Sequence, residues 1–165
     1  MSRPAARITD LVAHPLPPVL TGGPGSATVL IGGLPAWRGI PAASVPGLQA
    51  AKQASDTAIR AAETATIAAA GTPGAPAAKA AEETLKTSQA ASMGSMVSAL
   101  GAMTDTHQCA TPLPIPPHGP GVVIDGSQTV LINNLPACRL GDTIVEALGS
   151  PNKITQGCMT VLIGG

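Results

Sequence analysis

The tetrapeptide Thr-Val-Leu-Ile occurs three times in this chain of 165 residues, and no other feature constrains the fold as strongly. The first two copies continue through Gly-Gly or Asn-Asn into Leu-Pro-Ala-Xaa-Arg. A β-branched run, a two-residue turn of this kind and a second short run are typical of a β-hairpin. The sequence therefore predicts three equivalent hairpin units, which contain residues 28–31, 129–132 and 160–163.

The third copy breaks off at Gly-Gly, and its missing return strand lies at the other end of the chain, as Pro-Ala-Ala-Arg at residues 4–7. Pro4 and Pro35 are 31 residues apart, as are Thr129 and Thr160. We therefore expect the N-terminal strand to complete the third hairpin and to close three units into a ring with approximate threefold symmetry. Such closure removes exposed sheet edges, which otherwise promote aggregation.

An alanine-rich insertion separates the first two units, whose copies lie 101 residues apart instead of 31. The sequence predicts helices over residues 45–70 and 77–103, joined by a Gly- and Pro-rich turn into an antiparallel hairpin. The expected division is a β region at residues 1–38 and 104–165 and a helical insertion at residues 39–103.

The second predicted helix carries an apolar stripe, with residues at three- and four-residue spacing. The stripe is explained either by the seam between the two helices or by a docking surface for a partner. Its members are Met93, Met96, Val97, Leu100 and Met103.

Composition excludes several classes of protein. Nine basic and nine acidic residues form no basic block, so nucleic-acid binding is not expected. The N-terminus lacks the apolar core of a signal peptide, and no run of about 18 apolar residues suggests a spanning helix. Trp37 is the only aromatic residue, so we expect a thin core of small and branched aliphatic side chains. Three cysteines favour free or metal-bound thiols over a disulfide framework.

The Pro-Ala-Ala-Arg motif, its variants at residues 35–38 and 136–139, and the repeated Thr-Val-Leu-Ile strands resemble the PAAR-repeat proteins. The resemblance covers about residues 1–38 and 104–165. It implies a mainly β fold, a pseudo-threefold cone of short hairpins with the helical hairpin inserted. It also implies that the base of the cone sits on the trimeric VgrG spike of a type VI secretion system, or on a related phage-tail spike, and that the apex binds zinc through His and Cys.

All three histidines of the chain lie in the β region, and Cys158 stands where the other two units have serine. Zinc prefers four tetrahedral nitrogen and sulfur ligands, and four protein ligands leave no position for substrate, so such a site is structural. We expect one structural Zn²⁺ bound by His14, His107, His118 and Cys158.

Two other residues are alternative ligands at this stage, and a third is not expected to bind the metal. Cys109 lies two residues from His107 and is the main rival ligand. Glu146 follows Asp142 by four residues, as His14 follows Asp10, but we expect its side chain to be solvated. Cys138 is expected to be a small buried apolar residue.

The resulting hypothesis is a non-enzymatic spike tip, made in the cytoplasm and exported by the secretion apparatus, that sharpens the spike and aids membrane puncture. A pseudo-threefold monomer suits a trimeric partner because three similar faces meet three identical subunits. The helical insertion would contact an effector or chaperone. Two alternatives are a membrane-active helical hairpin and a zinc hydrolase, which would need a general base and an open metal position.

Overall fold

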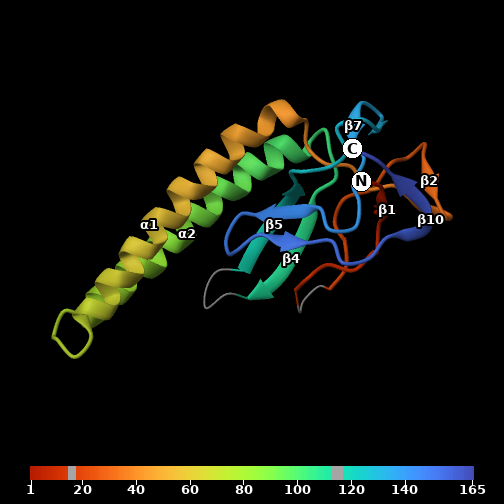
Figure 1. Cartoon of the computed structure of the whole chain (residues 1–165). Helices are drawn as coiled ribbons and strands as arrows, with labels where there is room; N and C mark the ends of the chain where they lie inside the picture. Colours follow the sequence, from red (N-terminus) through yellow and green to blue (C-terminus); the bar gives the residue numbers. More distant parts are fainter. Residues whose placement is uncertain (15–17, 113–116) are drawn as a thin grey trace.

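The computed structural model describes residues 1–14, 18–112 and 117–165. A region of short strands carries a projecting pair of long antiparallel helices (Figure 1), which confirms the predicted β region with an inserted helical hairpin. Because the helices are long, the described chain as a whole is a mixture of helix and strand and not mainly β. The helices are α1 (Val45–Ala69) and α2 (Ala75–Gly101), preceded by the short 3-10 helix η1 (Ala42–Ser44). The strands are β1 (Arg3–Ala5), β2 (Leu30–Ile31), β3 (Leu34–Pro35), β4 (His107–Pro112), β5 (Pro117–Val123), β6 (Leu131–Ile132), β7 (Leu135–Pro136), β8 (Thr143–Glu146), β9 (Asn152–Lys153) and β10 (Cys158–Ile163).

Three hairpins repeat the same register, as the sequence predicts. They pair β2 with β3, β6 with β7, and β10 with β1. The N-terminal strand therefore does complete the third hairpin. In the first two hairpins both turn residues have positive φ, which Gly and Asn tolerate, as in type I′ turns. The leucine of each repeat faces a proline, in the pairs Leu30 with Pro35, Leu131 with Pro136 and Leu162 with Pro4.

Equivalent residues of the three Pro-Ala-Xaa-Arg segments form a closed ring of backbone hydrogen bonds. Ala6 N–H donates to Cys138 O (2.8 Å), Trp37 N–H to Ala6 O (3.0 Å), and Cys138 N–H to Trp37 O (3.0 Å). All three side chains are fully buried in one cluster. Of the three only Trp37 is large. The side chains share the centre of the ring, where one large side chain packs beside two small ones.

An arginine–aspartate pair closes the turn after each of these segments. In every case the arginine backbone N–H donates to an aspartate oxygen at 2.7 or 2.8 Å, and Nη2 lies 2.8–3.2 Å from the other oxygen. All three carboxylates are buried, and a buried charge is tolerated where it is paired and hydrogen-bonded. The pairs are Arg7 with Asp10, Arg38 with Asp105, and Arg139 with Asp142.

The helical insertion replaces the second of these turns. Two residues separate arginine from aspartate in the first and third turns, whereas residues 39–104 separate Arg38 from Asp105. The same ion pair nevertheless forms, and Thr104 Oγ1 donates to Arg38 O (2.8 Å). The inserted helices therefore begin and end at neighbouring points of an otherwise regular β region.

The apolar stripe of α2 packs on the β region. Met93 and Val97 are buried in a cluster with Leu48 of α1 and residues of β5 and β8, whereas Met96 and Met103 are exposed. A seam between the helices is thus only part of the explanation, because the stripe also seats the hairpin on the sheet.

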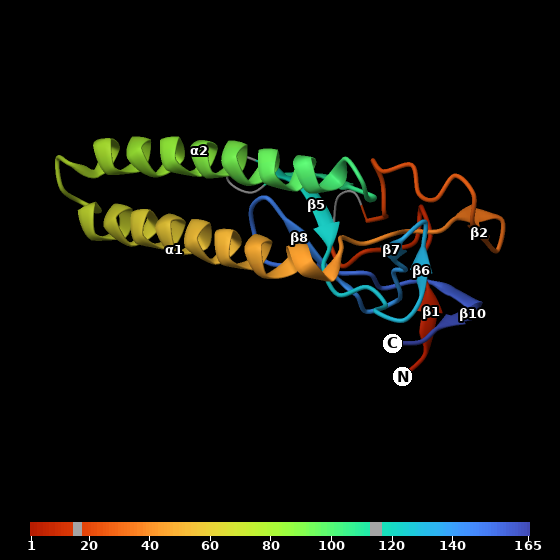
Figure 2. The same cartoon turned by 90° about the horizontal axis from the view of Figure 1, so that it is seen from above.

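Beyond this contact, the seam between the helices is polar. Glu82 is buried and accepts hydrogen bonds from Lys79 (3.1 Å) and Lys86 (2.7 Å), and Lys86 also pairs with Glu63 of α1 (2.7 Å). The hydrogen bond from Lys86, followed by those from Thr66 and Lys79, lowers the pKa of Glu82 to about 2. The helices extend away from the side on which β2 and β10 lie (Figures 1 and 2).

The largest sheet has the order β4-β5-β8-β9 and is antiparallel. Gly121 of β5 pairs with His107 on one side and with Glu146 on the other. Val145 and Ala147 belong to the cluster that includes the α2 stripe. Because side chains alternate along a strand, Glu146 points to the opposite face.

Candidate functional site

Four buried side chains form a group that could bind a metal ion. Each offers one ligand atom, and these atoms all lie within 4.8 Å of one another. The group, called the metal group below, consists of His14, His107, Cys109 and Glu146.

Three members of the metal group occupy equivalent positions. His14, Cys109 and Glu146 each lie four residues after the aspartate of an arginine–aspartate turn. His107 comes two residues before Cys109 on β4, so both side chains lie on the same face of the strand. The pseudo-threefold fold thus brings one ligand from each turn together, and β4 supplies a fourth.

Gly121 leaves the space that the carboxylate of Glu146 needs. A Cβ atom at this position would lie 2.8 Å from Cγ of Glu146, closer than real contacts allow. Gly121 also lies between His107 and Glu146 in the sheet register. A side chain here would displace the carboxylate from the metal group.

The nitrogen and oxygen atoms of the metal group converge. Nε2 of His14 lies 2.9 Å from Nε2 of His107 and 3.2 Å from Oε1 of Glu146, which is 3.7 Å from Nε2 of His107. Sγ of Cys109 lies 3.8 Å from Nδ1 of His14. Burial, and secondarily the neighbouring His14, lowers the pKa of His107 to about 4. His107 is therefore neutral near pH 7, which is the form that binds metals.

The donor set fits a divalent cation. Oε1 of Glu146 is fully buried and has no hydrogen-bond partner among the described residues, although it faces two imidazole nitrogens. A buried carboxylate oxygen in this position is costly unless a cation is nearby. Two imidazoles, one thiolate and one carboxylate are ligand types that zinc accepts.

The structure does not gather the four ligands that the sequence suggests. His14 and His107 belong to the metal group. His118 lies beside it, with its ring 6.2 Å from that of His14 and its Nδ1 2.7 Å from Oε2 of Glu146. Glu146 is fully buried, so the expectation of a solvated side chain is wrong. Cys138 is buried in the core, as expected.

Cys158 lies in a different part of the molecule from the metal group. It packs in an apolar cluster with residues of the three hairpins, and its Sγ is 3.2 Å from Oγ1 of Thr160. The hydrogen bond from Thr160, followed by backbone hydrogen bonds and the charge of Arg7, lowers the pKa of the Cys158 thiol. Its equivalents Ser26 and Ser127 also accept backbone N–H groups two and three residues on. Cys158 therefore stands at the start of its strand, in the position from which Ser26 and Ser127 accept backbone hydrogen bonds in the other two units.

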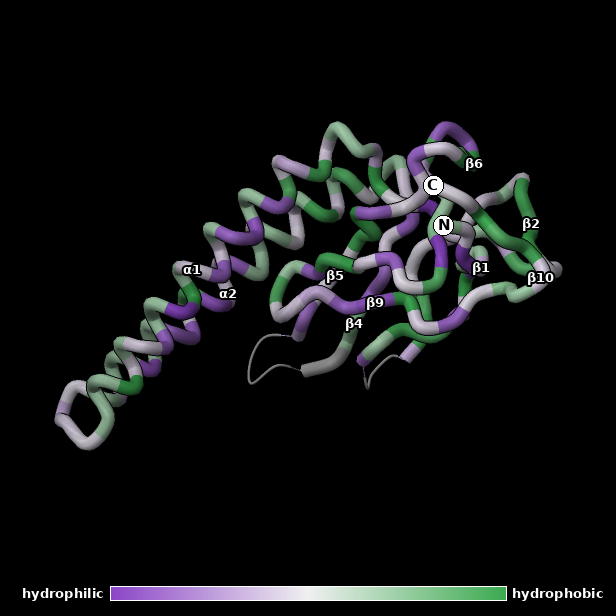
Figure 3. The backbone as a smooth tube through the Cα atoms, in the orientation of Figure 1, coloured by the Kyte–Doolittle hydropathy of each residue, from purple (hydrophilic) through white to green (hydrophobic). Residues whose placement is uncertain are grey.

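A second candidate surface consists of the leucines of the three repeats, called the base surface below. Leu30, Leu131 and Leu162 are 62, 55 and 59 % exposed. The isoleucine that follows each of them is only 5–7 % exposed. β2 and β10 accordingly appear as hydrophobic segments at one side of the molecule (Figure 3). Three equivalent apolar side chains thus face solvent.

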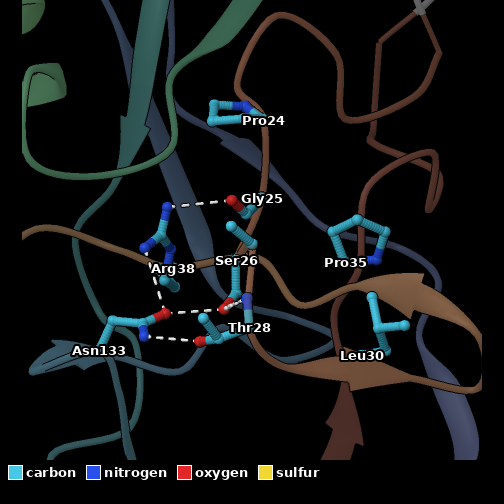
Figure 4. A pocket seen from close by; sticks show the side chains of 9 residues that line it. Pro24, Gly25, Ser26, Thr28, Leu30, Pro35, Arg38 and Asn133 are labelled. Atoms are coloured by element: carbon cyan, nitrogen blue, oxygen red, sulfur yellow. Dashed lines mark hydrogen bonds between the residues drawn. The ribbon is translucent and has the colours of Figure 1, made fainter.

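A hollow beside the base surface lies between the first and second units (Figure 4). Its polar groups bond to one another: Arg38 donates to Gly25 O (3.1 Å), Ser26 Oγ donates to Asn133 Oδ1 (2.7 Å), and Asn133 Nδ2 donates to Thr28 Oγ1 (2.9 Å). The two bonds of Asn133 join the first and second units, so we interpret the hollow as structural.

No helix within residues 1–14, 18–112 and 117–165 is long and apolar enough to cross a membrane. Residues 115–165 match the family model described as PAAR motif. This segment contains β6, β7 and β10, which belong to the second and third hairpins. No curated protein and no solved structure matches the chain.

Proposed function

Because this chain is a PAAR-repeat protein, and the PAAR motif is associated with the VgrG spike tip of type VI secretion systems, we propose that it caps and sharpens a trimeric VgrG-type spike. In this role it would aid membrane puncture and effector delivery. The observation that carries the proposal is the base surface, where Leu30, Leu131 and Leu162 are exposed to nearly the same degree.

The base surface matches a threefold partner in both symmetry and chemistry. Three similar faces on one chain can meet three identical subunits. In β10, Met159, Val161 and Leu162 are 73, 37 and 59 % exposed, although such side chains are usually buried. A strand of this kind can continue the β-structure of a partner, and its apolar side chains add buried area.

Binding to the cognate trimeric spike protein tests this proposal. We expect one copy of this chain per spike trimer in mass photometry, and Leu162→Glu should abolish the complex. Ile67→Glu is the matched control, because Ile67 is 74 % exposed but lies on α1. Equal loss of binding in both variants, or full binding by Leu162→Glu, would contradict the proposal.

The metal group binds one structural Zn²⁺ in the proposed tip. When bound, the ion supplies a crosslink between segments that are distant in the sequence, which a small core cannot provide alone. His14, His107, Cys109 and Glu146 would hold it, leaving no coordination position for a substrate. The protein is accordingly proposed to act as a structural component and not as an enzyme.

The inserted helices act as an adaptor for an effector or chaperone in this proposal, with residues 39–103 as the insertion and residues 1–38 and 104–165 as the β region. Two features support this division: the insertion replaces a single turn, and its helices extend away from the base surface (Figure 2).

The chain would be made in the cytoplasm and exported by the apparatus. Replacing residues 39–104 by Leu-Gly, the residues of the third turn, should preserve spike binding and abolish cargo binding.

A further inference from the structure

The two oxygens of the Glu146 carboxylate have different surroundings. Oε2 accepts a hydrogen bond from Nδ2 of Asn152 (3.0 Å) and lies 2.7 Å from Nδ1 of His118. Oε1 faces the imidazoles of His14 and His107 and has no hydrogen-bond partner among the described residues. One oxygen is therefore fixed by neighbouring strands, and the other points into the metal group.

We propose that His118 and Asn152 are positioning residues, which hold Glu146 so that Oε1 binds the metal. The inference rests on the proposed metal site and assigns His118 a place outside the coordination sphere. It thereby departs from the ligand set of three histidines and one cysteine that the sequence suggests.

The surroundings of the His118 ring support this assignment. Gly149, with φ of 81°, lies against the ring, and a Cβ atom there would be 3.2 Å from Nε2 of His118. The other nitrogen, Nδ1, is the one that faces Glu146. Binding a metal through Nδ1 would break this contact, so the orientation of the ring favours the positioning role.

The three residues lie on adjacent strands of one sheet. His118 is on β5, Glu146 on β8 and Asn152 on β9, and these strands are hydrogen-bonded neighbours. Positions fixed by strand pairing are held more rigidly than positions on loops. A carboxylate held from both sides in this way is pre-oriented for coordination.

The buried carboxylate also balances the charge of the site. A divalent cation, one thiolate and the carboxylate of Glu146 together carry no net charge, and burial of net charge is strongly unfavourable. This balance holds whether Glu146 binds the ion directly or lies beside it, so the choice of Glu146 as a ligand rests on the position of Oε1 among the imidazole nitrogens.

The test uses the full-length protein loaded with Zn²⁺, and separately with Co²⁺ as a spectroscopic probe. The variants are His118→Leu, which removes the hydrogen bond to Glu146, and His118→Gln, whose amide can restore it. Asn152→Leu tests the second positioning residue, and Lys153→Ala, exposed on the same strand, is the matched control. Metal content, competition with a chelating dye, Co²⁺ absorption and circular dichroism are measured.

We expect His118→Leu and Asn152→Leu to retain one metal per chain and the Co²⁺ band positions of the unmodified protein, with affinity reduced by about 10- to 100-fold. His118→Gln should recover most of the affinity, and Lys153→Ala should match the unmodified protein. Glu146→Gln should shift the Co²⁺ bands because it alters a ligand. If His118→Leu does not fold, Asn152→Leu provides the same comparison.

Two results would overturn the assignment. Loss of the metal, or a shift of the Co²⁺ bands, in folded His118→Leu would make His118 a ligand. Unmodified affinity and spectrum in Glu146→Gln would exclude Glu146 from the site. Failure of the proposed metal site itself is a distinct outcome, because the unmodified protein would then bind neither Zn²⁺ nor Co²⁺.

Discussion

The base surface and the metal group use the same pseudo-threefold fold in opposite ways. At the base surface the three equivalent positions hold the same residue, and Leu30, Leu131 and Leu162 have nearly equal exposure. In the metal group the three equivalent positions hold a histidine, a cysteine and a glutamate. The three units therefore have the same residue at the base surface and different residues in the metal group.

The difference follows from what each region binds in the proposed function. A trimeric partner presents three identical subunits, so each unit must offer the same contact. A tetrahedral metal needs four ligands, and three equivalent positions supply only three, so β4 adds His107. The three equivalent positions at the centre of the ring also hold different residues. Trp37 fills a space there that cannot accept three large side chains.

Removing the metal is expected to have the largest effect. Structural zinc contributes on the order of 10 kcal/mol in small domains. A strong chelator should therefore lower the melting temperature more than any single change at the base surface. Cys109→Ser should lower it similarly and make the protein insensitive to the chelator in thermal scans. A chelator-induced shift that persists in Cys109→Ser would place the metal elsewhere.

Breaking the buried ion pairs should have the next largest effect. Asp142→Asn leaves both Arg139, whose side chain is 4 % exposed, and Arg3 without their charge partner, and loss of a partner from a buried pair costs about 3–5 kcal/mol. Asp10→Asn should cost less, because it removes the partner of Arg7, which is 16 % exposed and can be partly hydrated. Urea unfolding of both variants measures the difference, and an equal cost would show that burial of the arginine is not the cause.

Exchanging the leucines one at a time should show how closely the base surface follows threefold symmetry. Each of Leu30→Ala, Leu131→Ala and Leu162→Ala removes about 1.5–3 kcal/mol of apolar burial in the complex. The three variants should weaken binding to the spike trimer by similar factors, about 10- to 100-fold, with unchanged unfolding curves. Calorimetric titration measures these factors. A single dominant leucine would show that the units dock unequally.

A smaller effect is expected at Thr9, which has a φ of 71° in the first arginine–aspartate turn. The equivalent residue of the third turn is Gly141, with φ of 87°. A β-branched residue at positive φ is strained by about 1–3 kcal/mol, of which the lower backbone entropy of Thr offsets part. Thr9→Gly should therefore raise the free energy of unfolding by about 1 kcal/mol in urea, and Gly141→Thr should lower it.

The hairpin ring could be predicted from the sequence because its contacts use identical residues. Thr-Val-Leu-Ile and Pro-Ala-Xaa-Arg recur with constant spacing, and the matched spacing of Pro4 and Pro35 joins the two ends of the chain. The helices were predicted to within two residues at each end, since the Gly- and Pro-rich turn and the apolar stripe mark them. Because the motifs repeat, the topology of the ring can be predicted from the sequence without knowledge of the side-chain contacts.

The metal group was harder to predict because its members differ in residue type. The signal present was positional: His14, Cys109 and Glu146 each follow an aspartate by four residues. Residue type points instead to His118, which lies beside the metal group, and to Cys158, which lies in a different cluster. Only the tertiary fold shows that the carboxylate of Glu146 is buried, and the burial depends on Gly121 in the neighbouring strand.

Replacing Cys158 is expected to have the smallest effect, and it distinguishes the metal group from the hairpin cluster most directly. Its equivalents are Ser26 and Ser127, and its sulfur lies near Thr160 and not in the metal group. Cys158→Ser should therefore keep one metal per chain and change the free energy of unfolding by less than about 1 kcal/mol, because serine already fills the same position twice. Metal analysis and urea unfolding beside Cys109→Ser provide the comparison. If Cys158→Ser lost the metal while Cys109→Ser kept it, the ligand would lie in the third hairpin, and the separation between a symmetric base and an asymmetric metal group would fail.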